Sequence, residues 1–214
     1  MFIRKEDFNE VKIIPSILVY LLMNFGIIFV IEIIDDSFLD KNTNVVQLII
    51  DCLFILYLFF KFGVNFRKLN KLIHDFIEKI NIKEILNVVF TQILISLGTT
   101  LLILAIVCFI DLDMANSLNS SGDDIFTNTV SVFILTVITA PILEELLFRV
   151  VIFKRLSRIF DVYIGMIFSS ILFGILHVEL AVVGAIIFGI ANCILYLKYR
   201  NILIPMTVHF LNNL

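Results

Sequence analysis

The sequence predicts an all-α membrane protein, a polytopic bundle of about seven transmembrane helices with one cytoplasmic amphipathic helix. Two observations predict this class. Of the 214 residues, 60% are hydrophobic and 16% are charged, and the mean hydropathy is +1.06. A soluble domain is roughly half apolar and a quarter charged, so the excess indicates lipid as the solvent. The apolar residues also gather in runs near the ~20-residue length that a helix needs to cross a bilayer.

Seven apolar runs separated by polar segments are the expected spans. They cover residues 13–34, 45–64, 85–110, 126–153, 162–178, 180–199 and 202–214. The first run is longer than the core of a signal peptide, so we expect it to be a retained span. Because the spans use nearly all of the length, we expect residues 1–214 to form a single integral membrane domain.

The charges between the spans predict the orientation. Basic residues crowd the connections 61–83 and 154–158, whereas 35–44 and 111–124 hold a single lysine and many acids. By the positive-inside rule the N-terminus is cytoplasmic. The richness in Ile, Phe, Asn and Lys is typical of an AT-rich bacterial genome, so we expect a multi-pass protein of a bacterial plasma membrane. The net charge of −3 and the scattered basic clusters exclude a nucleic-acid surface.

One basic connection carries the pattern of an amphipathic helix. Its apolar residues recur at helical spacing, while basic and acidic residues occupy the opposite face. The apolar set is Phe66, Leu69, Leu72, Ile73, Phe76, Ile77 and Ile80. We therefore expect this segment to lie on the cytoplasmic surface of the membrane. His74 falls among its polar residues and is assigned no role.

Ionisable residues inside spans are the candidates for function, because each costs about 2.5 to 3.5 kcal/mol on insertion scales. Glu32 and Asp51 fall near the outer ends of their spans, where side chains reach water, and are interpreted as structural. Glu144, Glu145 and Arg149 lie deep in the fourth span. Glu145 and Arg149 are one turn apart and can pair. Glu144 points about 100° away from Glu145, so that pairing leaves it without a partner.

Later spans supply partners for Glu144. His177 lies near the end of one span, and His209 and Asn213 share one face of the last. At ~1.5 Å of rise per residue, Glu144, His177 and His209 come out at roughly 15, 22 and 12 Å from the inner boundary. We therefore expect a carboxylate, two imidazoles and an amide to meet in one buried polar cavity.

These groups suit the hydrolysis of a peptide bond. Glu144 would deprotonate a water that His177 orients, and His209 and Asn213 would donate hydrogen bonds to the oxyanion formed at the peptide carbonyl. A zinc ion held by Glu144, His177 and His209 is the rival interpretation. The sequence lacks a His-Glu-x-x-His helix, and spacing alone leaves the two mechanisms open.

Three motifs carry a resemblance to a known family. In chain order they are Glu144-Glu145-Leu-Leu-Phe-Arg149, Phe173-Gly-Ile-Leu-His177 and His209-Phe-Leu-Asn-Asn213. With a basic connection after the first motif, this set resembles the CPBP intramembrane proteases, which are named for CAAX proteases and bacteriocin-processing enzymes and are also called the Abi family. The resemblance covers residues 126–214, and Val150 departs from it because a glycine commonly follows the arginine.

The resemblance implies a membrane endopeptidase in which Glu144 activates water, His177 assists, and His209 and Asn213 form the oxyanion site. Glu145 and Arg149 then support the first motif. A metal-free mechanism without a cofactor fits this set better than a zinc metalloprotease, which stays the alternative.

For a bacterial member, the resemblance implies bacteriocin maturation, self-immunity or signal-peptide processing rather than prenylated CAAX substrates. The expected partners are the lipid bilayer and a peptide or small membrane-associated protein as substrate. A non-catalytic bacteriocin immunity protein is the second hypothesis. A transporter is weaker, because the first half lacks a matching pair of broken helices.

Overall fold

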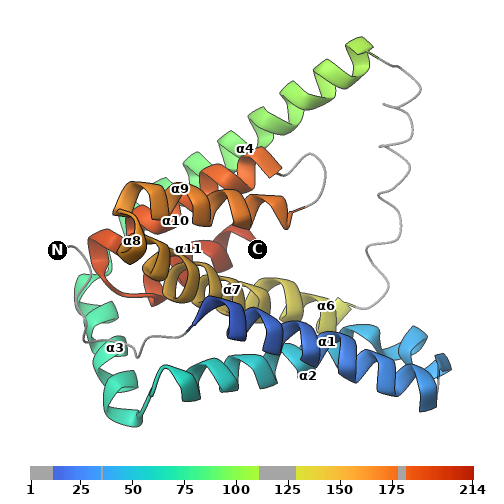
Figure 1. The fold of residues 1–214 in the computed structure, drawn as a ribbon. Coiled ribbons are helices and arrows are strands. Elements are labelled where there is room, and N and C mark those ends of the chain that lie inside the picture. Colours follow the sequence, from blue (N-terminus) through green and yellow to red (C-terminus); the bar gives the residue numbers. More distant parts are fainter. Residues whose placement is uncertain (1–11, 35, 111–128, 178–181) are drawn as a thin grey trace.

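The structure, a computed structural model, describes residues 12–34, 36–110, 129–177 and 182–214 (Figure 1). Every regular element in these ranges is a helix. The elements are α1 (Ile13–Ile34), α2 (Asp36–Lys61), α3 (Phe66–Lys79), α4 (Ile82–Ile110), α6 (Thr129–Phe133), η2 (Ile134–Thr139), α7 (Ala140–Glu145), η3 (Leu146–Phe153), α8 (Lys154–Ile159), α9 (Val162–Ile175), α10 (Val182–Tyr199) and α11 (Leu203–Asn212). The elements from α6 to α8 run on as one helix, residues 129–159, which we call the motif helix.

The predicted class, a helical membrane bundle, is confirmed. Within the described ranges, five helices are long and apolar enough to cross a bilayer: α1, α2, α4, the motif helix and α10. The other two predicted spans correspond to α9 and α11, which are apolar but have 14 and 10 residues. At ~1.5 Å per residue, neither reaches across a ~30 Å hydrocarbon core by itself. The predicted span ends at 126–128, 178 and 180–181 lie outside the described residues.

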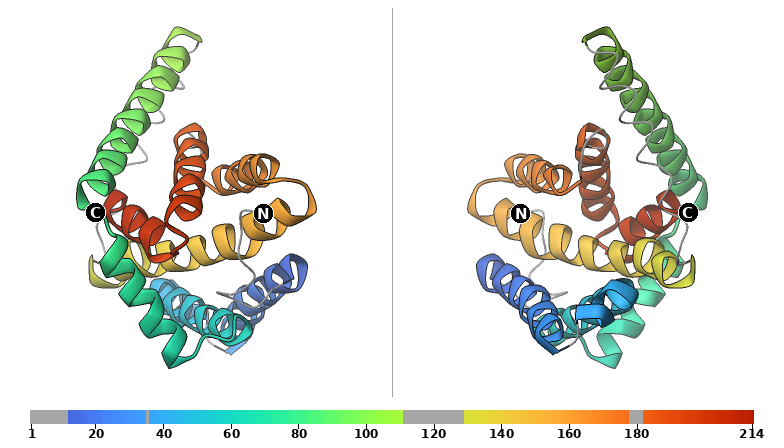
Figure 2. Two further views of the ribbon diagram at one scale, coloured as in Figure 1. Left: turned by 90° about the vertical axis from the view of Figure 1, so that its left-hand side faces the viewer. Right: turned by 90° about the vertical axis from the view of Figure 1, so that its right-hand side faces the viewer.

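The motif helix lies between two groups of helices. On one side α2 packs against it, with α1 outside α2; on the other side α9, α10 and α11 contact it. Figures 1 and 2 show α4 leaving this bundle, so that its later part projects past the other helices. The start of α4 is held against α10 and α11. The motif helix is therefore enclosed by α2 on one side and by the later helices α9, α10 and α11 on the other.

Side-chain caps explain where several helices begin. The carboxylate of Asp161 accepts hydrogen bonds from the backbone N–H groups of Tyr163 and Ile164, at 2.7 and 2.9 Å, and starts α9. The Asn65 side chain does the same for α3 through the Lys68 N–H. Such caps satisfy N–H groups that the first turn leaves without a partner. The sequence thus separates α3 from α2 and α9 from α8 by local chemistry.

Small residues let α9 and α10 approach closely. Gly189 of α10 faces Ser170 of α9, and a Cβ at position 189 would lie 2.9 Å from the Cβ of Ser170. Membrane helices commonly pack through small residues of this kind, because lipid gives apolar side chains no reason to prefer protein. This contact holds α10 against α9, the helix that carries most of the second motif.

The amphipathic helix predicted from the sequence is α3, which lies crosswise at the end of α2 (Figure 1). None of its residues is buried. A polar contact fixes its place: the Asn201 amide donates to the Leu72 carbonyl at 2.8 Å, and its oxygen accepts from the Leu203 N–H at 2.9 Å. Asn201 itself is 1% exposed. The turn between α10 and α11 therefore holds α3 against the bundle.

Replacing Asn201 with leucine is expected to loosen α3. The substitution keeps the size of the side chain but removes both hydrogen bonds, which should cost about 1 to 3 kcal/mol of unfolding free energy. Thermal unfolding in detergent and trypsin cleavage within α3 measure the effect. Asn70→Leu is the matched control, because Asn70 is exposed on α3 itself. Equal behaviour of the two variants would contradict the assigned role of Asn201.

Candidate functional site

The first motif begins in α7, an α-helical turn between two π-helical segments, and ends at Arg149 in the second of these segments, η3. Pro141 in α7 has no N–H to donate, and the preceding turn adopts the π pattern, with the Ala140 N–H bonded to the Leu135 carbonyl. In the same π pattern, the carbonyl of Thr136 would accept a hydrogen bond from residue 141, but the nitrogen of Pro141 carries no hydrogen. The Thr136 carbonyl accepts instead from the side-chain amide of Asn213, at 3.0 Å. Asn213 thus bonds a carbonyl that the proline would leave without its donor.

Glu145 is the centre of the buried polar cluster. Its carboxylate accepts hydrogen bonds from Arg149 Nε at 2.9 Å and Nη2 at 3.3 Å. Asn192 of α10 donates to the same carboxylate at 3.0 Å, and His209 Nδ1 of α11 lies 3.1 Å from it. The side chains of Glu145 and Arg149 are fully buried. The predicted pair exists, and it also joins the motif helix to α10 and α11.

Aromatic rings pack around this cluster. The ring of Phe173 lies 5.1 Å from the guanidinium carbon of Arg149 and 4.5 Å from the centre of the His177 ring. His209 packs edge-on against Phe188, with ring centres 4.8 Å apart, and lies 5.8 Å from Phe173. The aromatic residue of the second motif therefore contacts both histidines and the arginine.

Glu144 differs from Glu145 in its hydrogen bonding and in its exposure. Its Oε2 atom is buried without a hydrogen-bond partner, and 27% of the side chain is exposed. The nearest ionisable atom is Nε2 of His209, at 3.8 Å, beyond hydrogen-bond length. The His209 ring thus faces Glu145 with one nitrogen and Glu144 with the other. Glu144 is the accessible carboxylate of the pair.

His177 lies at the same site from the α9 side. Its Nδ1 atom is 2.9 Å from the carbonyl oxygen of Phe173, and the residue is half-buried. A carbonyl only accepts, so this contact places the ring proton on Nδ1 and leaves Nε2 as an acceptor. Both His177 and His209 lie near enough to Glu144 to act on it electrostatically. The structure therefore gathers the carboxylate and the two imidazoles that the sequence analysis expected to meet.

Sequence reasoning missed Asn192. It lies in the middle of α10 and is fully buried against Glu145. An uncharged amide carries no insertion penalty of the size that singled out the acids, so the depth argument passed over it. The signal in the sequence was a polar residue near the centre of an apolar span.

The interpretation of Asp51 as a residue reaching water was wrong. It is 4% exposed and accepts hydrogen bonds from Gln47 at 2.9 Å and from the Tyr20 hydroxyl at 3.1 Å. The reason is that α2 begins at Asp36, so Asp51 lies well inside the helix. Tyr20 also lies near enough to Glu144 to feel its charge. The side chain of Glu32 lies outside the described residues.

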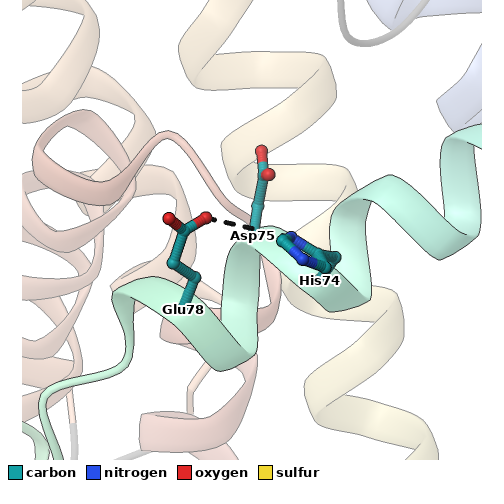
Figure 3. A group of neighbouring side chains, drawn as sticks. All are labelled: His74, Asp75 and Glu78. Carbon is teal, nitrogen blue, oxygen red and sulfur yellow. Dashed lines mark ion pairs between the residues drawn. The ribbon is translucent and has the colours of Figure 1, made fainter.

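A separate group could hold a cation by distance alone. His74, Asp75 and Glu78 offer ligand atoms within 4.8 Å of one another on α3 (Figure 3). His74 and Glu78 are exposed, and both are contained in one helix with Asp75. Among the described residues, this is the set of three whose ligand atoms come that close together.

Comparisons with known proteins concern the second half of the chain. Residues 126–214 match the family described as "Type II CAAX prenyl endopeptidase Rce1-like". A segment of 81 residues is 32% identical to the "Putative membrane peptidase YdiL" of Bacillus subtilis (strain 168). That match covers 37% of this chain and 33% of the relative. No solved structure gives a significant match. The resemblance to the CPBP family inferred from the three motifs is confirmed.

The two adjacent glutamates should differ sharply in their effect on stability. Glu145→Gln leaves the Arg149 charge buried without compensation and should cost about 3 to 5 kcal/mol. Glu144→Gln removes no hydrogen bond of the described residues and should leave the unfolding midpoint nearly unchanged. Thermal unfolding of both purified variants in one detergent compares them directly. Similar midpoints would show that Glu145 is not the anchor of the cluster.

Proposed function

Because residues 126–214 match a family of membrane endopeptidases, we propose that the chain is an intramembrane endopeptidase that hydrolyses peptide bonds with water activated by Glu144. One observation carries this proposal. Of two adjacent carboxylates in the same buried cluster, Glu145 is fully bonded and Glu144 has a free, buried oxygen on a partly exposed side chain. A general base needs an unengaged lone pair, which Glu144 keeps and Glu145 lacks.

In the proposed reaction, Glu144 Oε2 takes a proton from a water molecule while the water oxygen attacks the carbonyl carbon of the substrate. A tetrahedral intermediate with a negatively charged oxygen results. As the carbon–nitrogen bond breaks, Glu144 returns its proton to the leaving amine. His177 Nε2, left as an acceptor by the contact of Nδ1 with Phe173, orients the water. The role proposed for His177 beside Glu144 thus rests on the contact that orients the His177 ring.

His209 is proposed to stabilise the oxyanion. Its Nδ1 faces the ionised Glu145 carboxylate, which only accepts, so Nδ1 carries a proton. For Nε2 to donate a hydrogen bond as well, the ring must carry a proton on both nitrogens. Each nitrogen faces a carboxylate, Nδ1 that of Glu145 and Nε2 that of Glu144. Donors aimed at a developing oxyanion commonly supply 10²- to 10³-fold in rate. Asn213 uses one amide N–H on Thr136 and keeps a second for the same oxygen.

The proposed substrate is a peptide or a small membrane-associated protein, because the polar cluster lies in a helix bundle of membrane-spanning length. We place the protein in a bacterial plasma membrane with its N-terminus in the cytoplasm. Bacteriocin maturation, self-immunity or signal-peptide processing are the proposed roles. The family description names CAAX prenyl endopeptidases, so a prenylated peptide belongs among the substrates tested.

Glu144→Gln is expected to lower peptide cleavage by at least 100-fold, the usual range for loss of a general base. Purified protein in lipid vesicles, offered candidate peptides and followed by mass spectrometry, gives the rate. Glu78→Gln, an exposed change on α3, is the matched control and should keep full activity. Full activity of Glu144→Gln would refute the mechanism. If cells stay protected from a bacteriocin by that variant, the non-catalytic immunity hypothesis would replace it.

Activity is expected to survive removal of metal. In the proposed reaction Glu144 itself activates the water, so no step needs a metal ion. The measurement is cleavage after exhaustive chelation, together with the zinc content of the active protein. Loss of activity that equimolar zinc restores would instead favour the zinc metalloprotease.

A further inference from the structure

A cavity of about 430 Å³ lies behind the polar cluster, between α3, α11 and the motif helix. Its inner wall is apolar and includes Phe59, Leu72, Phe76, Ile142, Met206 and Phe210. Glu144, Glu145 and His209 are not part of this wall. The volume falls within the range of about 300 to 1,000 Å³ typical of ligand sites. The cavity is therefore a second hollow, separate from the proposed catalytic cluster.

Basic side chains also line this cavity. Lys68 and Lys71 come from α3, and Arg200 comes from the turn between α10 and α11. In the described part of the chain, none of the three forms an ion pair. The one acid of the lining, Asp75, is paired with Lys79 at 3.4 Å. The cavity therefore combines an apolar wall with three uncompensated positive charges.

Arg200 is held at the cavity by an uncommon backbone conformation. Its φ is +50°, in the left-handed region that favours glycine at the end of a helix. The next residue, Asn201, fixes this turn through its bonds to Leu72 and Leu203. Three elements thus place their charges and apolar side chains around one space, and the Asn201 bonds hold α3 in its place.

The outer edge of α3 indicates what surrounds the cavity. Phe66 and Ile77 are 75% and 68% exposed, and Ile73 is exposed as well. On an amphipathic helix beside a membrane bundle, such an apolar edge lies in lipid. The other edge of the same helix, with Leu72, faces the cavity. Lipid molecules are therefore the ligands that surround the cavity. The positive charges of Lys68, Lys71 and Arg200 favour lipids with an anionic headgroup.

We propose that this cavity binds an anionic phospholipid. An acyl chain occupies the apolar wall beside Phe76 and Met206, and the phosphate group is held by Lys68, Lys71 and Arg200. Each basic side chain near an anionic membrane surface contributes about 1 kcal/mol, or roughly five-fold in affinity. A zwitterionic lipid fills the same apolar wall but carries no net charge for the rim to recognise.

The chain contains no tryptophan, so a single introduced one reports on the cavity. Phe76→Trp places the indole in the wall, and Ile77→Trp places it on the lipid-facing edge one residue away. The full chain is reconstituted in vesicles containing either phosphatidylglycerol or phosphatidylcholine with brominated acyl chains, which quench tryptophan on contact. The proposal expects Phe76→Trp to be quenched at a much lower mole fraction of the anionic lipid. Ile77→Trp is expected to be quenched alike by both lipids.

The double substitution Lys68→Gln/Lys71→Gln, added to Phe76→Trp, tests the basic residues that line the cavity. Preference for the brominated phosphatidylglycerol should fall about twenty-five-fold, five-fold for each charge removed. Arg67→Gln/Lys83→Gln removes the same charge from nearby positions outside the lining and should leave the preference unchanged. Unfolding midpoints in detergent confirm that all variants are folded. Neither result depends on peptidase activity, so the catalytic proposal stands or falls separately.

Two outcomes would overturn the lipid site. Equal quenching of Phe76→Trp by both lipids, or none by either, would show that the cavity does not select or admit the anionic lipid. An equal loss of preference in both double substitutions would show diffuse surface attraction in place of a site. Preference that is lost only with Lys68 and Lys71 supports the proposal.

Discussion

The buried carboxylate of Glu145 is the interaction on which the arrangement of the second half depends. It compensates the charge of Arg149, which is fully buried, and it bonds Asn192 and His209 from two other helices. A buried charge without a partner is costly in a protein interior, and lipid offers no water as an alternative. The motif helix, α10 and α11 are therefore fixed in register by one side chain. The orientation of the His209 ring follows from the same bond.

The division of labour between the two glutamates follows from helix geometry. Adjacent positions point about 100° apart, so a cluster that encloses Glu145 cannot enclose Glu144 as well. α11 is fastened to the motif helix twice, by His209 at Glu145 and by Asn213 at Thr136. These two residues are one helical turn apart, and so a single face of α11 sets the distance of its imidazole from Glu144. The free carboxylate is a consequence of how firmly its neighbour is held.

Much of this could be predicted from the sequence, because it depends on periodicity and charge. Spacing was enough for the Glu145–Arg149 pair and for α3, and the scarcity of ions in spans was enough to select Glu144. Asn192 was missed because an uncharged amide costs less free energy to insert into the membrane than a charged side chain. Asp51 was placed too near the end of its span because α2 begins at Asp36, before the apolar run. Pro141 reveals a missing backbone donor in the sequence, but the π-helical turn and the contact of Asn213 with Thr136 require three-dimensional structure.

Polar contacts locate the helices in this bundle because apolar side chains are nearly as well accommodated by lipid as by protein. α3 has no buried residue, yet Asn201 gives it one position against the turn after α10. The start of α4 is tied to the end of α10 by Glu84 and Lys198, and its middle by the bond from Gln92 to the Gly184 carbonyl at 3.1 Å. α3 and α4 are thus each placed by a few polar groups. Asn201 thereby fixes one wall of the apolar cavity, and the bonds to Glu145 fix the geometry around Glu144, so both sites follow from how a helix bundle gains specificity in lipid.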